Sequence, residues 1–328
     1  MQLWDIDAGP NQSIKGRFQR DANGHEVWVL SLKRAWQFME KQWVEVDDVE
    51  VYDDPLFLGE PGFSSMVADH DFPVLKRNTD VIIYGKARSY ANRPVKHHQC
   101  RLLIDGHIDK TLDVIGPRQW VSHGGSITVS TPQAFIVQDV DYCHALGGDH
   151  RNRLGCGIAQ SNQELLSCAV PSVFYSSQDW QANTDKVEVA GFGPLPPFFS
   201  ERLSYAGTYD ETWFEERRPL LPLDFDVKFY QCAPKDQQCK SFLNGGERVM
   251  VSGFSHDDVL SFRIPSEQYQ AVARFGEDER TVDMKLYTLW INTEKMRIEA
   301  TYTAAFPCQG QEHTLVSSKV LPVVEVLL

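Results

Sequence analysis

The chain has 328 residues with a formal net charge of −13, and 42% of them are hydrophobic, enough for a core in one large domain or two ordinary ones. The negative charge argues against nucleic acid and anionic membranes as partners, because both would repel the chain. It has no run of about 18 apolar residues to span a bilayer and no leader with the basic and apolar regions of a signal peptide, so we expect a cytoplasmic protein.

The first half of the chain shows the alternation of side chains that is typical of β-strands. A long strand is expected over 26–38, with 44–52 as its hairpin partner, and a helix over 31–42 is the competing interpretation. Within the strand, one face would carry Val27, Val29, Ser31 and Lys33 and the other Trp28, Leu30 and Leu32. Shorter strands are expected at 81–84, 99–104, 110–114, 120–121 and 126–129.

The last third of the chain alternates more clearly and has short polar turns between its apolar runs. An antiparallel sheet of at least four strands is expected within 240–328. The candidate strands are 248–254, 259–264, 270–275, 281–291, 296–306 and 316–326. The predicted fold is therefore mainly β, with antiparallel sheets forming one or two β-sandwich-like units and few short helices.

Three regions follow from this pattern. A β-rich N-terminal domain is expected over 1–180 and an antiparallel β domain over 240–328, joined by an ordered Gly/Pro/aromatic segment over 181–239 that contains one short helix. One continuous sandwich is the alternative, because the joining segment is too rich in aromatic residues for a free linker. The short helix is expected at Asp210–Arg217, with Asp210 or Thr208 as its N-cap.

Residues 191–234 carry the most distinctive pattern. They contain GFGP, then Arg202, then YAGTYDE-x-W, PLLP-x-DFD and AP-x-DQQ. Upstream are K-x-x-TD-(apolar)3-x-G-x-A from Lys76 to Ala87 and G-x-R-x-W from Gly116 to Trp120. Tyr142, Gly147, Gly148, Asn152, Gly155 and Gly157 complete the series.

In this order, the motifs resemble those of the DUF2169 family, which is encoded in bacterial type VI secretion loci. The chain departs from the family pattern at Cys143-His144, where a Glu-Arg pair is usual, and at Leu146 and Arg153. The resemblance implies a non-enzymatic adaptor or chaperone that binds and stabilises a PAAR-bearing effector and helps to load it onto the VgrG spike. It implies no cofactor.

Seven residues are candidates for partner binding or for organising the loops. Arginine can bond several carbonyls or a carboxylate at once, and exposed aromatic side chains are typical of contact faces. Asp210 is also a helix cap. The candidates are Arg118, Trp120, Arg202, Tyr205, Tyr209, Asp210 and Trp213.

No motif predicts catalysis. Cys143, His144, His150 and Cys156 could supply zinc ligands, but their spacing matches no common zinc site, so no metal is expected. The seven cysteines are expected to be free thiols. Two alternatives remain open: an enzyme that acts on a small molecule or glycan in a cleft between loops 145–157 and 191–207, and a structural spike component that is itself secreted.

Overall fold

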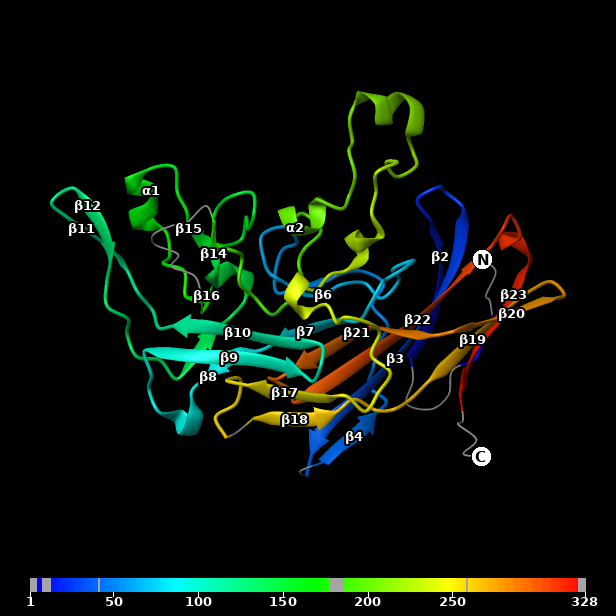
Figure 1. The fold of residues 1–328 in the computed structure, drawn as a ribbon, viewed down its shortest axis with the longest axis horizontal. Helices are drawn as coiled ribbons and strands as arrows, with labels where there is room; N and C mark the ends of the chain where they lie inside the picture. The colour runs from blue at the N-terminus through cyan, green and yellow to red at the C-terminus, as the bar shows by residue number, and fades with distance from the viewer. Residues whose placement is uncertain (1–4, 8–12, 41, 177–185, 258, 324–328) are drawn as a thin grey trace.

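The computed structural model describes residues 5–7, 13–40, 42–176, 186–257 and 259–323 (Figure 1). It is mainly β, with 42% strand and 11% helix, in several antiparallel sheets. The predicted fold class is confirmed. Among the described residues, no helix is long and apolar enough to cross a bilayer.

The strands of the first half are short apart from β2, β3, β9 and β10. They are β1 (Asp5–Asp7), β2 (Ser13–Arg20), β3 (Glu26–Met39), β4 (Gln42–Val46), β5 (Leu56–Phe57), β6 (Met66–Ala68), β7 (Asp80–Tyr84), β8 (Lys86–Arg88), β9 (His97–Ile104), β10 (Ile108–Ile115), β11 (Trp120–His123), β12 (Ser126–Val129), β13 (Val137–Asp139), β14 (Leu146–Gly147), β15 (Cys156–Gly157) and β16 (Val173–Tyr175).

The second half has longer strands. They are β17 (Arg248–Ser252), β18 (Leu260–Arg263), β19 (Tyr269–Phe275), β20 (Asp278–Asp283), β21 (Lys285–Asn292), β22 (Arg297–Pro307) and β23 (Leu315–Pro322). The helical pieces are α1 (Asn162–Ser167), α2 (Ser200–Leu203), a π-helical turn (Trp213–Arg217) and the 3-10 turns Tyr90–Asn92, Tyr142–His144, Val227–Tyr230, Lys235–Gln237 and Glu312–Thr314.

A six-stranded sheet in the order β2-β3-β22-β21-β7, with β4 also paired to β3, forms the centre of the molecule. The long strand β3 is bonded along its length to β2 and β4 on one side and to β22 on the other. This two-sided pairing requires an extended backbone, so the alternative of a helix over 31–42 is wrong. The predicted hairpin partner over 44–52 is shorter than expected and lies at Gln42–Val46.

The alternation along β3 sorts its side chains onto the two faces as predicted. Trp28, Leu30 and Leu32 are fully buried in the main core, while Val27 and Val29 belong to a smaller cluster on the other face. The main core is shared with a five-stranded sheet, β16-β10-β9-β17-β18, and a four-stranded sheet, β1-β23-β19-β20. The six-stranded sheet therefore packs against two others in a sandwich-like arrangement.

Aromatic pairs join the layers of this sandwich. The rings of Trp43 on β4 and Phe262 on β18 are 5.1 Å apart, and those of Tyr269 on β19 and Tyr302 on β22 are 5.0 Å apart. The indole Nε1 of Trp28 donates to Ser318 Oγ at 2.9 Å, which ties β3 to β23.

The expected single C-terminal sheet is wrong. The strands after residue 240 are distributed among all three large sheets, each of which also contains a strand from the N-terminal part. The predicted strand 281–291 is divided at Met284, whose backbone N–H bonds to Tyr269 O at 2.9 Å before the chain enters β21. Here the chain changes sheets, as at the corner of a sandwich. The domain division at 180 and 240 stays a prediction, and the sheets join strands from both sides of it.

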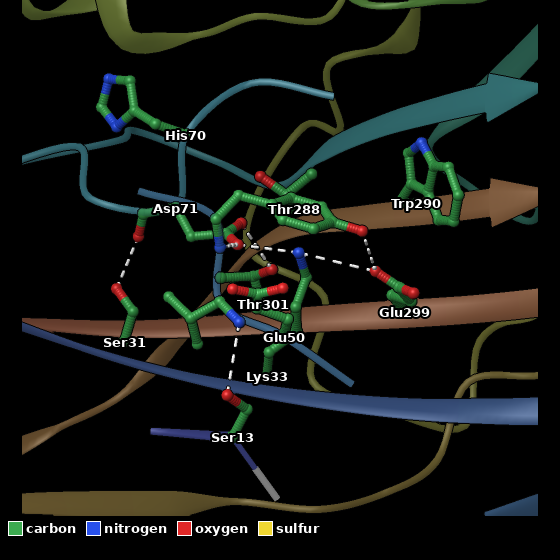
Figure 2. Close-up of polar contacts among 12 residues, drawn as sticks. Ser13, Ser31, Lys33, Glu50, His70, Asp71, Thr288, Trp290, Glu299 and Thr301 are labelled. Carbon is green, nitrogen blue, oxygen red and sulfur yellow. Dashed lines mark hydrogen bonds and ion pairs between the residues drawn. The ribbon is translucent and has the colours of Figure 1, made fainter. Parts of the chain in front are cut away.

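The outer face of β3 and β22 carries a buried polar network (Figure 2). Lys33 Nζ bonds to Asp71 Oδ2 at 2.7 Å and lies 3.5 Å from Glu299 Oε2. Thr301 Oγ1 donates to Asp71 Oδ1 at 3.0 Å, and the ring of Tyr52 covers the Lys33 ammonium. Burial, together with the neighbouring carboxylates, raises the pKa of Tyr52. This network fastens the chain around Asp71, and with it the neighbouring Asp69, to the sheet.

Candidate partner-binding site

The main chain of the GFGP motif is hydrogen-bonded to the packed sheets and their adjoining turns, which we call the body. Phe192 O accepts bonds from Ile83 N at 3.0 Å and Gln237 Nε2 at 2.8 Å, and Gly191 O accepts from Lys110 Nζ at 2.6 Å. A Cβ on Gly191 would lie 2.4 Å from the ring of Tyr142, so only glycine fits.

The K-x-x-TD motif fixes the far end of the same segment. Lys76 Nζ bonds to Asp80 Oδ2 at 2.5 Å, and that carboxylate accepts from Cys232 N at 2.8 Å and Gln231 Nε2 at 2.8 Å. Burial lowers the pKa of Lys76, but the groups around it, with Asp80 first among them, together hold that pKa above its ordinary value. These charged groups are used within the fold, where they fasten residues 231–237 to β7.

Arg202 on α2 joins three parts of the chain. It is only 3% exposed. Its Nη2 lies 2.6 Å from Asp69 Oδ2, its Nε donates to Phe229 O at 2.7 Å and its Nη1 donates to Leu195 O at 2.9 Å. Burial would raise the pKa of Asp69, but the Arg202 guanidinium holds it below its usual range. The contacts of Arg202 are those of a residue that organises loops.

Between these fixed points, residues 207–225 leave the body as an excursion that we call the arm (Figure 1). Its two ends are joined by Asp224, whose carboxylate accepts from Thr208 N at 2.9 Å and Thr208 Oγ1 at 2.7 Å. Just outside the arm, Asp226 N bonds to Tyr205 O at 3.0 Å, and Lys228 Nζ lies 5.4 Å from the centre of the Tyr205 ring.

The arm is braced from within and against the β2–β3 turn. Asp210 Oδ1 accepts from Trp213 N, the first residue of the helical turn, at 2.8 Å, and Trp213 Nε1 donates to Leu220 O at 2.8 Å. Arg217 donates to Ala22 O at 2.8 Å, in the turn between β2 and β3. The arm therefore has a defined shape.

Apolar side chains on the arm are exposed. The exposed fraction is 53% for Tyr209, 58% for Phe214 and 85% for Leu223. Tyr209 packs edge-on against Trp213, with ring centres 4.7 Å apart, and Phe214 lies beneath the Arg218 guanidinium at 5.1 Å. A braced loop with exposed aromatic side chains is typical of a surface that contacts another protein. Phe214 and Leu223 are not among the seven predicted residues, although both belong to the aromatic and Pro-rich run.

Residues 23–303 match the family model described as an uncharacterized protein conserved in bacteria, DUF2169. The chain belongs to this family. No curated protein and no solved structure matches it.

Two of the seven predicted residues lie elsewhere in this DUF2169 protein. Arg118 donates to Pro171 O and stacks over the ring of Phe174 at 5.6 Å, and Trp120 Nε1 donates to Ala169 O at 3.4 Å. These contacts join the segment around β11 to the chain before β16. The remaining five candidates, from Arg202 to Trp213, lie in α2 and the arm or directly beside them.

The motif over Tyr142–Gly157 forms a tight loop. Asn152 Nδ2 donates to Tyr142 O at 2.8 Å, and a Cβ on Gly147 would lie 2.3 Å from Asn152 O. His144 Nδ1 is 2.9 Å from Asp141 Oδ1, and this hydrogen bond raises the pKa of His144. Over the described residues, no group of His, Cys, Asp and Glu side chains has an arrangement suited to a metal ion.

An open cleft of about 860 Å³ lies beside α2, lined by residues of both Gly-rich loops. Asp236 accepts from Lys110 Nζ and from Tyr175 Oη, each at 2.9 Å, and burial raises the pKa of Glu201. The lining includes the carboxylates of Glu188, Glu201 and Asp236, and the buried Lys110 bonds to Asp236. Of its lining residues, Tyr205 was among the seven predicted candidates, whereas Glu201 and Asp236 were not.

Proposed function

We propose that this DUF2169 protein is a non-enzymatic adaptor that binds a second protein through the arm. The observation that carries the proposal is the arm itself, braced by Arg217 and Asp224 while Tyr209, Phe214 and Leu223 stay exposed. Because the loop that carries these exposed side chains is already ordered, association with a partner costs less conformational entropy.

The partner class follows from the family resemblance. It is an effector that carries a PAAR domain, and the adaptor stabilises it in the cytoplasm and helps to load it onto the VgrG spike. The family's polar motif residues support a binding role, because Lys76, Asp80 and Arg202 are buried and hydrogen-bonded within the fold. They hold the segment that carries the arm.

Co-expression with a PAAR-domain protein encoded in the same gene neighbourhood tests the proposal, and the absence of any such gene there would count against it. We expect the two proteins to copurify, and the soluble level of the PAAR-domain protein to rise several-fold when the adaptor is present. No copurification and no change in that level would refute the adaptor. Finding the chain itself in the secreted fraction would favour a structural spike component instead.

The cleft favours a second candidate, an enzyme or binding protein for a small molecule or glycan. Glu201 has a raised pKa while Asp236 is bonded to a lysine, and two carboxylates in different environments are the usual basis of acid–base chemistry. This candidate is tested by measuring the unfolding temperature of the protein in the presence of each member of a library of glycans and small metabolites. A ligand whose stabilisation disappears in Glu201→Gln would support it.

A further inference from the structure

The arm is acidic as well as apolar. Its exposed carboxylates include Glu211, Glu215 and Glu216. Over the described residues, these three side chains form no ion pair and no side-chain hydrogen bond. Many other acidic side chains are paired, as Glu299 is with Arg297 at 2.8 Å. The arm therefore carries three unpaired carboxylates within six consecutive positions of the chain.

The acidic groups alternate with the exposed aromatic side chains in a repeated pattern. Tyr209 is followed by Asp210 and Glu211, and Phe214 is followed by Glu215 and Glu216. Each exposed ring therefore has two carboxyl groups directly after it in the chain. Such an arrangement fits a partner surface that offers an apolar pocket with positive charge at its rim.

The basic residues of the arm do not neutralise this charge through ion pairs. Arg217 directs its guanidinium to the carbonyl oxygens of Leu221 and Ala22, and Arg218 lies over the Phe214 ring. Glu211 and Glu215 are four residues apart, a spacing at which like charges destabilise a helical turn. The charge distribution weakens the free arm, and a cationic partner would remove that cost.

We infer that the arm inserts into an apolar groove rimmed by lysine or arginine on the partner protein. The inference rests on the proposed function and specifies the chemistry of the partner surface. The apolar contact supplies most of the affinity, and the carboxylates set orientation and association rate.

Charge reversal tests the inference. The variant Glu215→Lys with Glu216→Lys changes two exposed side chains without intramolecular partners, so its unfolding temperature should match that of the parent. Its affinity for the neighbouring PAAR-domain protein should fall about ten-fold or more at about 0.05 M salt, and the difference should shrink to within about three-fold at about 0.5 M salt, where charges are screened.

The matched control reverses two exposed glutamates on other turns, Glu40→Lys with Glu277→Lys. It changes the net charge equally but away from the arm, at the β3–β4 and β19–β20 turns (Figure 1). We expect less than about three-fold loss of affinity at either salt concentration.

The outcomes separate the inference from the proposed function. If the arm reversal and the control weaken binding equally, or if the arm reversal strengthens it, the partner surface is not basic and the inference fails while the adaptor stands. If the parent chain binds no PAAR-domain protein at either salt concentration, the proposed function and the inference that rests on it both fail.

Discussion

Arg202 is buried, and its guanidinium bonds to Asp69 as well as to the carbonyl oxygens of Leu195 and Phe229. The sequence predicted an arginine that organises loops, because Arg202 lies within a Gly-, Pro- and aromatic-rich run. It did not identify Asp69 as the partner, since nothing near Asp69 in the sequence marks it. Pairs of this kind depend on how distant segments pack.

Removing this arginine should strongly destabilise the protein. Arg202→Met leaves the Asp69 carboxylate buried without its cation, which typically costs about 3–5 kcal/mol of unfolding free energy. Urea denaturation measures the loss. In the double variant Arg202→Met with Asp69→Leu, much of the loss should be recovered, and a double variant as unstable as the single one would contradict this account of the pair.

The pH dependence of the same variant follows from the sign of the Asp69 shift. In the parent the pKa of Asp69 is lowered, so its stabilising contribution is present above about pH 4, the unfolded value, and is lost as pH falls through the folded value. Without Arg202, burial raises that pKa and the folded state binds the additional proton.

The stability of Arg202→Met relative to the parent should therefore increase as pH falls from about 7 to about 5. Burial, with a contribution from Arg202, lowers the pKa of the nearby His70, so parent and variant are both compared in a His70→Asn background. Denaturation midpoints at several pH values provide the difference in stability, and a difference that stays constant or widens on acidification would argue against the assignment.

At the scale of the element, the arm combines predicted and unpredicted features. The helical turn after Asp210 is local and was predicted from Asp210 and the nearby Pro219. Its projection from the body was not predicted, because the brace from Arg217 to Ala22 joins residues 195 positions apart. Exposure of Phe214 and Leu223 follows from this geometry and has no local signal.

The arm should be removable without loss of the fold. Replacing residues 209–223 by a short Gly-Ser link joins Thr208 to Asp224, which are already hydrogen-bonded. The deletion removes the contacts between Arg217 and the β2–β3 turn. Each kcal/mol of unfolding free energy lost with them should lower the unfolding temperature by only about 2–4 °C. Thermal unfolding measured by circular dichroism checks this, and a variant that is insoluble or lacks a cooperative transition would show that the arm is part of the folding core.

At the scale of the whole molecule, the positions of the strands were predicted better than the pairing of strands within the sheets. The alternation of Trp28 and Leu30 with Val27 and Val29 identified β3 because that signal is local. Its pairing with β22 could not be inferred, since it places Lys33 beside Thr301 and depends on contacts between distant parts of the chain. The same non-local pairing explains why one C-terminal sheet was expected where three sheets share those strands.

Neither end of the chain should therefore fold alone. Residues 240–328 on their own lack β3 and β7, the two strands that flank β22 and β21, so we expect them to show no cooperative unfolding transition and weak near-ultraviolet circular dichroism. Mixing them with residues 1–239 during refolding should restore both signals if the sheets reassemble. A cooperative transition for 240–328 by itself would instead support the predicted independent domain.

The central claim is that the arm binds the partner protein while the body only holds it in place. The most direct test is the dissociation constant for the proposed partner, a PAAR-domain protein. It is measured by calorimetry for Tyr209→Ser, Phe214→Ser and Leu223→Ser combined, against Tyr90→Ser, Val316→Ser and Leu321→Ser as a control on other exposed apolar residues. We predict about 100-fold weaker binding for the arm variant and less than about three-fold for the control, at unchanged unfolding temperatures. Equal affinities for the parent and both variants would contradict the claim.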